Sequence, residues 1–108
     1  MLVKDFKAAL SLTSLTDGGD EREITGCYCG DLLSWVMSKA SEGDCWLTVM
    51  GNINAVAVAV LTDCACIVLT ENAPLDENAK QRAELEGVSI LTTEKNSYQL
   101  AAEISGLI

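Results

Sequence analysis

Hydrophobic residues in the second half of the chain form continuous runs separated by short polar segments. Three of these runs, residues 45–50, 65–70 and 88–92, are short and nearly uncharged. Runs of this kind are typical of strands buried on both faces, as in a parallel sheet covered by helices. Residues 52–61 alternate Ala and Val, a pattern that fits either a strand or a helix. We predict a helix there, because the segment lies between two strands in an alternating series of elements.

Apolar residues at helical spacing predict four more helices. They are expected near residues 2–10, 30–40, 74–86 and 96–108. Asp31 would lie in the first turn of the second of these helices, where its negative charge suits the helix dipole. Gly43 and Gly87 would end two of the helices, since glycine readily takes the left-handed cap conformation.

Two shorter strands, at residues 12–15 and 23–29, complete the expected elements. Strand and helix alternate at least three times in the second half, with loops too short for antiparallel hairpins, which implies right-handed βαβ crossovers. The length of 108 residues suits one compact domain. We therefore expect a single α/β domain of three layers, with an open, mostly parallel sheet and helices on both faces.

The charge of the chain excludes several classes of partner. The formal net charge is −9, the pI is about 4.2, and the seven Lys and Arg residues are scattered. This balance argues against binding to a nucleic-acid backbone or an anionic membrane. Residues 45–62 are uncharged, but Gly51, Asn52 and Asn54 interrupt them, so we expect no membrane span. The N-terminus lacks the apolar core of a signal peptide, and we expect a cytoplasmic protein.

Five cysteines, at positions 27, 29, 45, 64 and 66, are expected to be thiols, because their number is odd and the chain is expected in the cytoplasm. Alternate residues of a strand share a face, so Cys27, Cys29, Cys64 and Cys66 could form a metal or iron–sulfur site. The alternative is that the cysteines act as small buried hydrophobes. The chain has no histidine and no Cys-x-x-Cys, so we expect no metal and no cofactor.

The first candidate ligand site surrounds the expected helix start at residue 30. It consists of Thr25, Gly26, Gly30, Asp31 and Ser34. The glycines would let a ligand approach backbone amides at a helix start, and the hydroxyl groups would supply hydrogen bonds. The alternative is ordinary turn and capping chemistry.

The second candidate ligand site lies at the carboxyl ends of the predicted strands, where open parallel sheets bind their ligands. It consists of Gly51, Asn52, Asn54, Thr70 and Glu71, and Asn72, Thr92 and Thr93 extend the same edge. Asparagine amides both donate and accept hydrogen bonds, which suits a base edge, a ribose or a peptide. The alternative is that Asn52 caps a helix and the other residues form exposed loops.

Four segments of the chain, taken in order, resemble the DRTGG domain family. They are G-C-Y-C-G-D-L-L-S-W-V-M (26–37), N-I-N-A-V-A-V-A-V-L (52–61), C-I-V-L-T-E-N-A-P-L-D (66–76) and G-V-S-I-L-T-T-E-K-N-S-Y-Q-L-A (87–101). Such domains occur in phosphotransacetylases, beside CBS domains and as short proteins, some encoded near iron-only hydrogenases. The resemblance implies a regulatory role.

The chain departs from the family pattern in one respect, and it lacks a motif that a label often given to the family would require. The D-R-T-G-G string itself is absent, and E-I-T-G-C (23–27) stands in its place. Family members are often labelled as relatives of HPr serine kinase, but this chain has no G-x-x-x-x-G-K-[ST] phosphate loop. A kinase activity is therefore not expected.

The sequence predicts a regulatory function in place of catalysis. No histidine is present to act as a general base, and no Lys or Arg stands beside the cysteines to stabilise a thiolate. We predict a sensing domain that forms a homodimer, with Trp35 at the dimer contact, and binds a small, nucleotide-like anion at helix N-termini. The alternative is an accessory protein that docks onto a redox enzyme of the hydrogenase type, or onto its maturation machinery.

Overall fold

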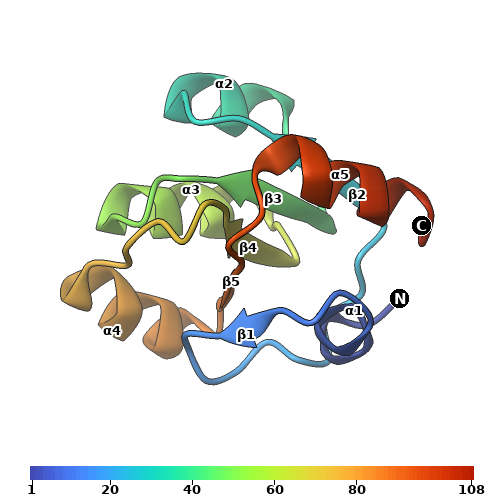
Figure 1. Cartoon of the computed structure of the whole chain (residues 1–108). Helices are drawn as coiled ribbons and strands as arrows, with labels where there is room; N and C mark the ends of the chain where they lie inside the picture. Colours follow the sequence, from blue (N-terminus) through green and yellow to red (C-terminus); the bar gives the residue numbers. More distant parts are fainter.

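The computed structural model describes all 108 residues and contains five helices and five strands (Figure 1). The helices are α1 (Val3–Ala9), α2 (Leu33–Lys39), α3 (Ile53–Thr62), α4 (Glu77–Glu86) and α5 (Ser97–Ser105). The strands are β1 (Thr13–Ser14), β2 (Gly26–Cys29), β3 (Asp44–Thr48), β4 (Cys66–Leu69) and β5 (Ser89–Thr92).

All five strands belong to one sheet in the order β1-β5-β4-β3-β2. The strands β2 to β5 are parallel, and β1 pairs antiparallel with β5. Between β3 and β5 the chain crosses over twice, through α3 and then α4, which confirms the predicted βαβ order. Residues 52–61 are helical as expected, and the Asn52 side chain caps α3 by accepting a 2.9 Å hydrogen bond from the Ala55 amide.

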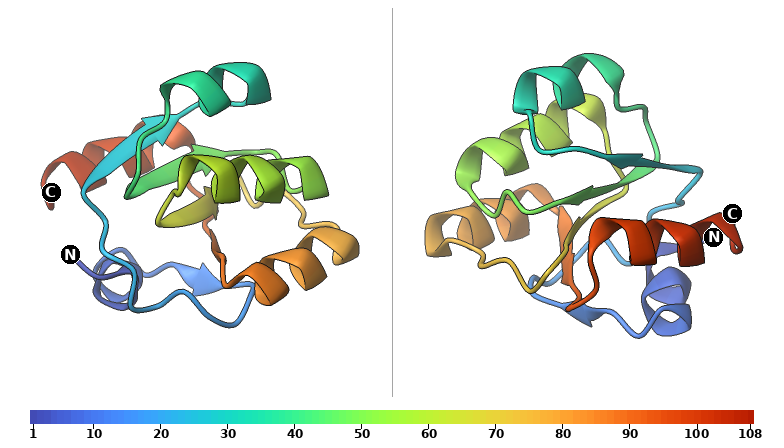
Figure 2. Two further views of the ribbon diagram at one scale, coloured as in Figure 1. Left: turned by 180° about the vertical axis from the view of Figure 1, so that it is seen from behind. Right: turned by 45° about the horizontal axis from the view of Figure 1, so that its top comes forward.

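Helices cover both faces of the sheet, so the predicted three-layer α/β architecture is confirmed (Figure 2). Helices α1 and α5 pack on one face, and α2, α3 and α4 pack on the other. Successive strand residues alternate between the two cores: Cys45 and Leu47 contribute to the α1–α5 core, and Trp46 contributes to the opposite one. Burial on both faces explains why these strands are continuously apolar.

The helix predicted from residue 30 is shorter than expected. Strand-like pairing continues past β2, because the Gly30 amide donates to the Leu47 carbonyl, and the helix begins only at Leu33. Asp31 therefore lies before the first turn, where its carboxylate accepts hydrogen bonds from the Thr48 hydroxyl at 2.8 Å and the Val49 amide at 2.9 Å. Asp31 therefore joins the ends of β2 and β3, and the prediction that it interacts with the helix dipole is wrong.

The two glycines predicted to end helices have different outcomes. Gly87 follows α4 with φ of +72°, as predicted for a left-handed cap. Helix α2 already ends at Lys39, and Gly43 (φ +84°) lies in the turn that leads into β3. Both need the left-handed conformation, but only Gly87 caps a helix.

The uncharged stretch at residues 45–62 is divided between β3 and α3. The longest helices, α3 and α4, have ten residues each. None of the helices combines the length and hydrophobicity that a membrane crossing requires.

Candidate functional site

The loops that follow β4 and β5 are bonded together at the carboxyl edge of the sheet. The Glu71 amide donates to the Lys95 carbonyl at 2.9 Å, and the Asn72 amide donates to the Thr93 carbonyl at 2.8 Å. Glu71 and Asn72 both adopt left-handed backbone conformations, with φ of 56° and 54°. These bonds hold the backbone of Asn72 beside the end of β5.

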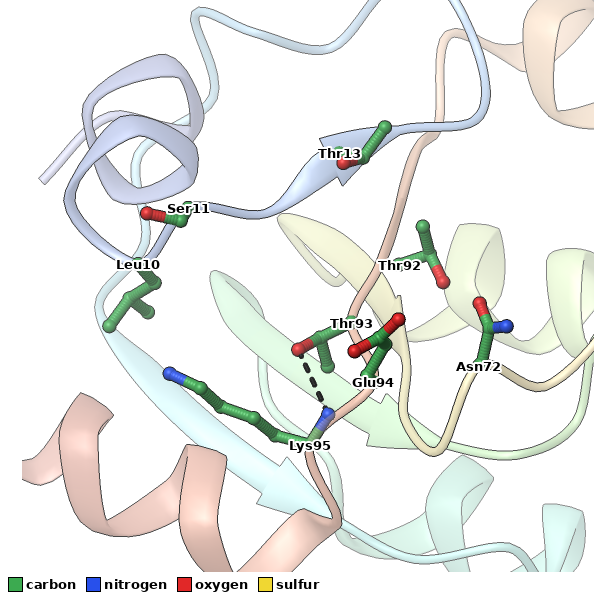
Figure 3. Close-up of a pocket in the computed structure, with 8 residues that line it drawn as sticks. All are labelled: Leu10, Ser11, Thr13, Asn72, Thr92, Thr93, Glu94 and Lys95. Carbon is green, nitrogen blue, oxygen red and sulfur yellow. Dashed lines mark hydrogen bonds between the residues drawn. The ribbon is translucent and has the colours of Figure 1, made fainter.

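Two adjoining hollows open at this edge, and we refer to them together as the β1–β5 groove. The first, of about 390 Å³, is lined by Leu10, Ser11, Thr13, Asn72, Thr92, Thr93, Glu94 and Lys95 (Figure 3). The second, of about 310 Å³, is lined by Leu15, Asn72, Ala73, Pro74, Leu75, Lys80 and Thr92. Asn72 and Thr92 line both hollows, so the two form a continuous depression.

Most of the groove lining is polar, with hydroxyl groups, one side-chain amide and two lysines. The Lys95 ammonium donates to both carboxylate oxygens of Glu103 on α5 at 2.7 Å. Lys80 forms no ion pair with a carboxylate. The groove therefore offers the Lys80 ammonium, the Glu94 carboxylate and several neutral donors and acceptors, a set that suits a small polar molecule with an anionic group near Lys80.

The first predicted ligand site is divided between the two ends of β2. Thr25 and Gly26 lie at the amino end, and a Cβ atom on Gly26 would stand 2.5 Å from an Asp44 carboxylate oxygen. At the carboxyl end, the Gly30 carbonyl accepts a 2.8 Å hydrogen bond from the Trp46 indole. The structure therefore does not bring these residues together: Gly30, Asp31 and Ser34 remain near one another, but Thr25 and Gly26 are at the opposite edge.

The residues of the second predicted site do lie along the carboxyl edge, but several already have partners. A Cβ atom on Gly51 would overlap the Pro74 carbonyl, so the loop before α4 covers this position. Asn52 caps α3, and buried Thr70 shares a 3.2 Å hydrogen bond with the Ser97 hydroxyl. Asn54 and Glu71 are exposed. Whether any of these residues binds a ligand stays a prediction.

Half of the groove comes from the start of the chain and was not predicted from the sequence. Asn72, Thr92 and Thr93 were expected on this edge, whereas Ser11, Thr13 and Leu15 were not, and neither were Lys80 and Lys95 from later in the chain. The first three were missed because β1 pairs antiparallel with β5, which brings residues 10–15 alongside the carboxyl end of β5. A two-residue strand carries too little pattern to reveal its partner.

The four-cysteine metal site considered from the sequence is not formed. Cys64 belongs to the core beneath α2, α3 and α4, whereas Cys66 belongs to the core on the other face. Cys27 and Cys29 are exposed on β2. No group of three or more Cys, Asp or Glu side chains is arranged to hold a metal ion. Burial raises the pKa of Cys66, so this thiol stays protonated as an ordinary core residue.

Comparison with known proteins agrees with this architecture. Residues 15–107 match the family model of the DRTGG domain. Among curated proteins, none matches the sequence. One similar solved structure contains the CBS and DRTGG domains of the regulatory region of Clostridium perfringens pyrophosphatase, complexed with the activator diadenosine tetraphosphate. The TM-score is 0.76 at 13% identity, which establishes a shared fold, and the match covers 94% of this chain but 44% of the other. Since the family match spans most of its length, the chain belongs to the DRTGG domain family.

Proposed function

We propose that this chain is a non-catalytic regulatory domain that pairs with a second copy of itself and binds a small, nucleotide-like anion in the β1–β5 groove. The observation that carries the proposal is the exposure of many apolar residues on two neighbouring helices, which we refer to together as the α2–α3 face. It consists of Leu32, Trp35, Met37, Ile53, Ala57, Val60 and Leu61.

The α2–α3 face has the composition of an interface. Trp35 and Leu32 are each 58% exposed and Leu61 is 71% exposed, although all three are large and apolar. Helix α2 fully buries only Val36. Neighbouring exposed apolar side chains often mark a site where a protein associates with a partner.

Charge favours a second copy of the chain as the occupant of this face. Two molecules of net charge −9 repel each other, so they associate best through surfaces that carry no negative charge. None of the ten residues of α3 is charged, and Lys39 is the only charged residue of α2. The Lys39 ammonium lies 5.3 Å from the Trp35 ring centroid, where its charge interacts with the indole.

Sedimentation equilibrium over a range of protein concentrations tests the pairing. We expect a dimer for the natural chain and a monomer for Trp35→Ser combined with Leu61→Ser. The matched control is Tyr98→Ser, which removes an 83% exposed aromatic side chain from α5 on the other side of the sheet. A natural chain that is monomeric at every concentration would contradict the dimer, and co-purification from the host would then test docking onto a redox enzyme.

Ligand binding in the groove is supported by its lysines and hydroxyl groups and by the fold shared with a region solved with a nucleotide activator. Calorimetric titration with adenine and guanine nucleotides, including diadenosine tetraphosphate, is the test. We expect Lys80→Gln to weaken binding about tenfold or more, because a charge-assisted hydrogen bond contributes ~1.5–3 kcal/mol. The control is Lys39→Gln, which removes the same charge from the α2–α3 face, outside the groove, and should leave nucleotide binding unchanged. Absence of heat with every nucleotide would contradict the ligand proposal.

The side chains that line the groove support a non-catalytic role. Its lining contains hydroxyl, amide, ammonium and one carboxylate group, Glu94, with no thiol and no imidazole. No hydroxyl of the lining is hydrogen-bonded to a carboxylate that would act as its base. An activated nucleophile needs such a pairing.

A further inference from the structure

Three thiols lie side by side across three adjacent strands. In the sheet register Cys27 of β2 is the partner of Cys45 of β3, and Cys45 is the partner of Cys66 of β4. Paired residues of neighbouring strands project to the same face, which here is the α1–α5 face. Cys27 is exposed at the edge of the sheet, whereas Cys45 and Cys66 are buried. The row therefore runs from solvent into the core.

We propose that Cys27 and Cys45 form an oxidisable pair, in which Cys27 reacts with a small-molecule disulfide and Cys45 then closes a Cys27–Cys45 disulfide. This inference is independent of the dimer and of the groove ligand. All five cysteines are free thiols, and disulfides that form transiently in reducing compartments are usually catalytic or redox-sensing.

Cys27 is the nucleophile because two thiols surround it. The neighbouring thiol of Cys45, and to a lesser degree that of Cys29, favours the Cys27 thiolate and so lowers the pKa of Cys27. Burial and the nearby charge of Asp44 oppose this shift but do not cancel it. Partial burial, the Cys27 sulfur and the Asp31 charge raise the pKa of Cys29 to about 11. Of the two exposed thiols, Cys27 is therefore the one that ionises more readily.

Strand geometry selects Cys45 over Cys29 as the partner. Neighbouring strands are ~4.8 Å apart, so the Cα atoms of Cys27 and Cys45 fall within the range of about 4.4–6.8 Å that disulfides span. Cys27 and Cys29 are two residues apart on one strand, and at ~3.3 Å per residue their Cα atoms are ~6.6 Å apart, at the upper limit of that range. A bond across the strands needs less backbone movement.

The reaction balances as two thiol–disulfide exchanges. The Cys27 thiolate attacks one sulfur of the small disulfide, so that a mixed disulfide forms and one small thiolate leaves. The Cys45 sulfur then attacks the Cys27 sulfur, its proton passes to the second departing thiolate, and the Cys27–Cys45 bond forms. Two protein thiols are oxidised, and one small disulfide is reduced to two thiols.

The test is incubation of the full chain with glutathione disulfide, followed by alkylation of the remaining thiols and peptide mass spectrometry. Cleavage after Tyr28 separates Cys27 from Cys29, and cleavage after Trp46 separates Cys45 from Cys64 and Cys66. We expect two of the five thiols to be lost, with Cys27 and Cys45 recovered as one linked peptide pair. A dithiol reductant should restore all five.

Single variants separate the roles of the three cysteines. Cys27→Ala should abolish the reaction, Cys45→Ala should stop it at the mixed disulfide on Cys27, and Cys29→Ala should still give the Cys27–Cys45 bond. Alkylation of the reduced natural chain at neutral pH should be about tenfold faster at Cys27 than at Cys29, because a larger thiolate fraction outweighs the lower nucleophilicity of a more acidic thiol. A Cys27–Cys29 bond, or equal alkylation rates, would overturn the proposal.

Discussion

The two sides of the central sheet have cores of equal size but very different outer surfaces. Each core contains 13 buried residues. On one side, α1 and α5 bury apolar residues such as Phe6 and Ile104 and present Lys4, Asp5 and Glu103 to solvent. On the other side, α2 and α3 leave Trp35 and Leu61 exposed.

This difference shows which side of the sheet buries its apolar residues within a single molecule. Helix α5 is amphipathic: apart from Tyr98 and Ala102, its exposed residues are polar, so it needs no further partner. Helix α3 carries no charge, and its only polar residues are Asn54 and Thr62, so most of its exposed surface is apolar, as is typical of helices that are covered by a partner. The proposed pairing would cover the α2–α3 face, whereas the α1–α5 side would stay in solvent, and this contrast can be tested by substitution.

The largest effect is expected from Ile104→Ala, which removes a buried side chain from α5. Loss of apolar contacts and the remaining cavity should lower the free energy of unfolding by about 2–5 kcal/mol. Leu61→Ala, on the exposed face, should cost less than about 0.5 kcal/mol in the monomer. Urea unfolding at several protein concentrations measures both. If the loss in unfolding free energy caused by Leu61→Ala grows with protein concentration, the substitution has weakened association. If Leu61→Ala and Ile104→Ala lower the unfolding free energy of the monomer equally, the two sides of the sheet do not differ as described.

Alkaline pH should destabilise the thiol-containing core. The neighbouring Cys27 thiol, together with burial, raises the pKa of Cys45, and burial raises that of Cys66. Above a pH of about 8.5 the unfolded chain loses these protons while the native chain keeps them, so stability falls as the pH rises. We expect a loss of about 2 kcal/mol between roughly pH 9 and pH 10, measured by urea unfolding with reductant present. Cys45→Ala with Cys66→Ala should flatten this slope.

Asp31→Ala tests the link between the ends of β2 and β3. The carboxylate accepts from the Thr48 hydroxyl and the Val49 amide, and its removal leaves the buried Thr48 hydroxyl without this partner. The unfolding free energy should fall by about 1–2 kcal/mol. Asp31→Asn keeps an acceptor oxygen and should lose about half as much. Equal losses for the two variants would show that charge, and not the hydrogen bonds, is responsible.

The smallest losses of stability are expected from substitutions at the N-caps of α3 and α5, which lie on opposite sides of the sheet. Asn96 caps α5 in a capping box with Gln99, and Asn52 caps α3 through one hydrogen bond. Each substitution by Ala should cost about 1 kcal/mol in thermal or urea unfolding, with Asn96→Ala at the upper end. Asn52→Asp keeps the acceptor and should cost only a few tenths of a kcal/mol. A neutral Asn52→Ala would show that packing alone holds the start of α3.

Local pattern was enough to predict most of the elements and their order. The run at 65–70 gave β4, the Ala–Val segment gave α3, and Asn96 marked the start of α5, because burial and capping leave a signal within a few residues. The length of α2 was overestimated, since the hydrogen bonds of Gly30 and Asp31 to the neighbouring strand are not visible in a local pattern.

The sequence by itself determined a mostly parallel α/β sheet covered on both faces, and its resemblance to the DRTGG family. Tertiary structure alone decided the antiparallel pairing of β1 with β5 that forms the groove, the division of Thr25 from Asp31, and the register that aligns Cys27 with Cys45. The physical reason is that periodicity reports the burial of each residue within its own element. Strand order and register depend on contacts between residues far apart in the chain.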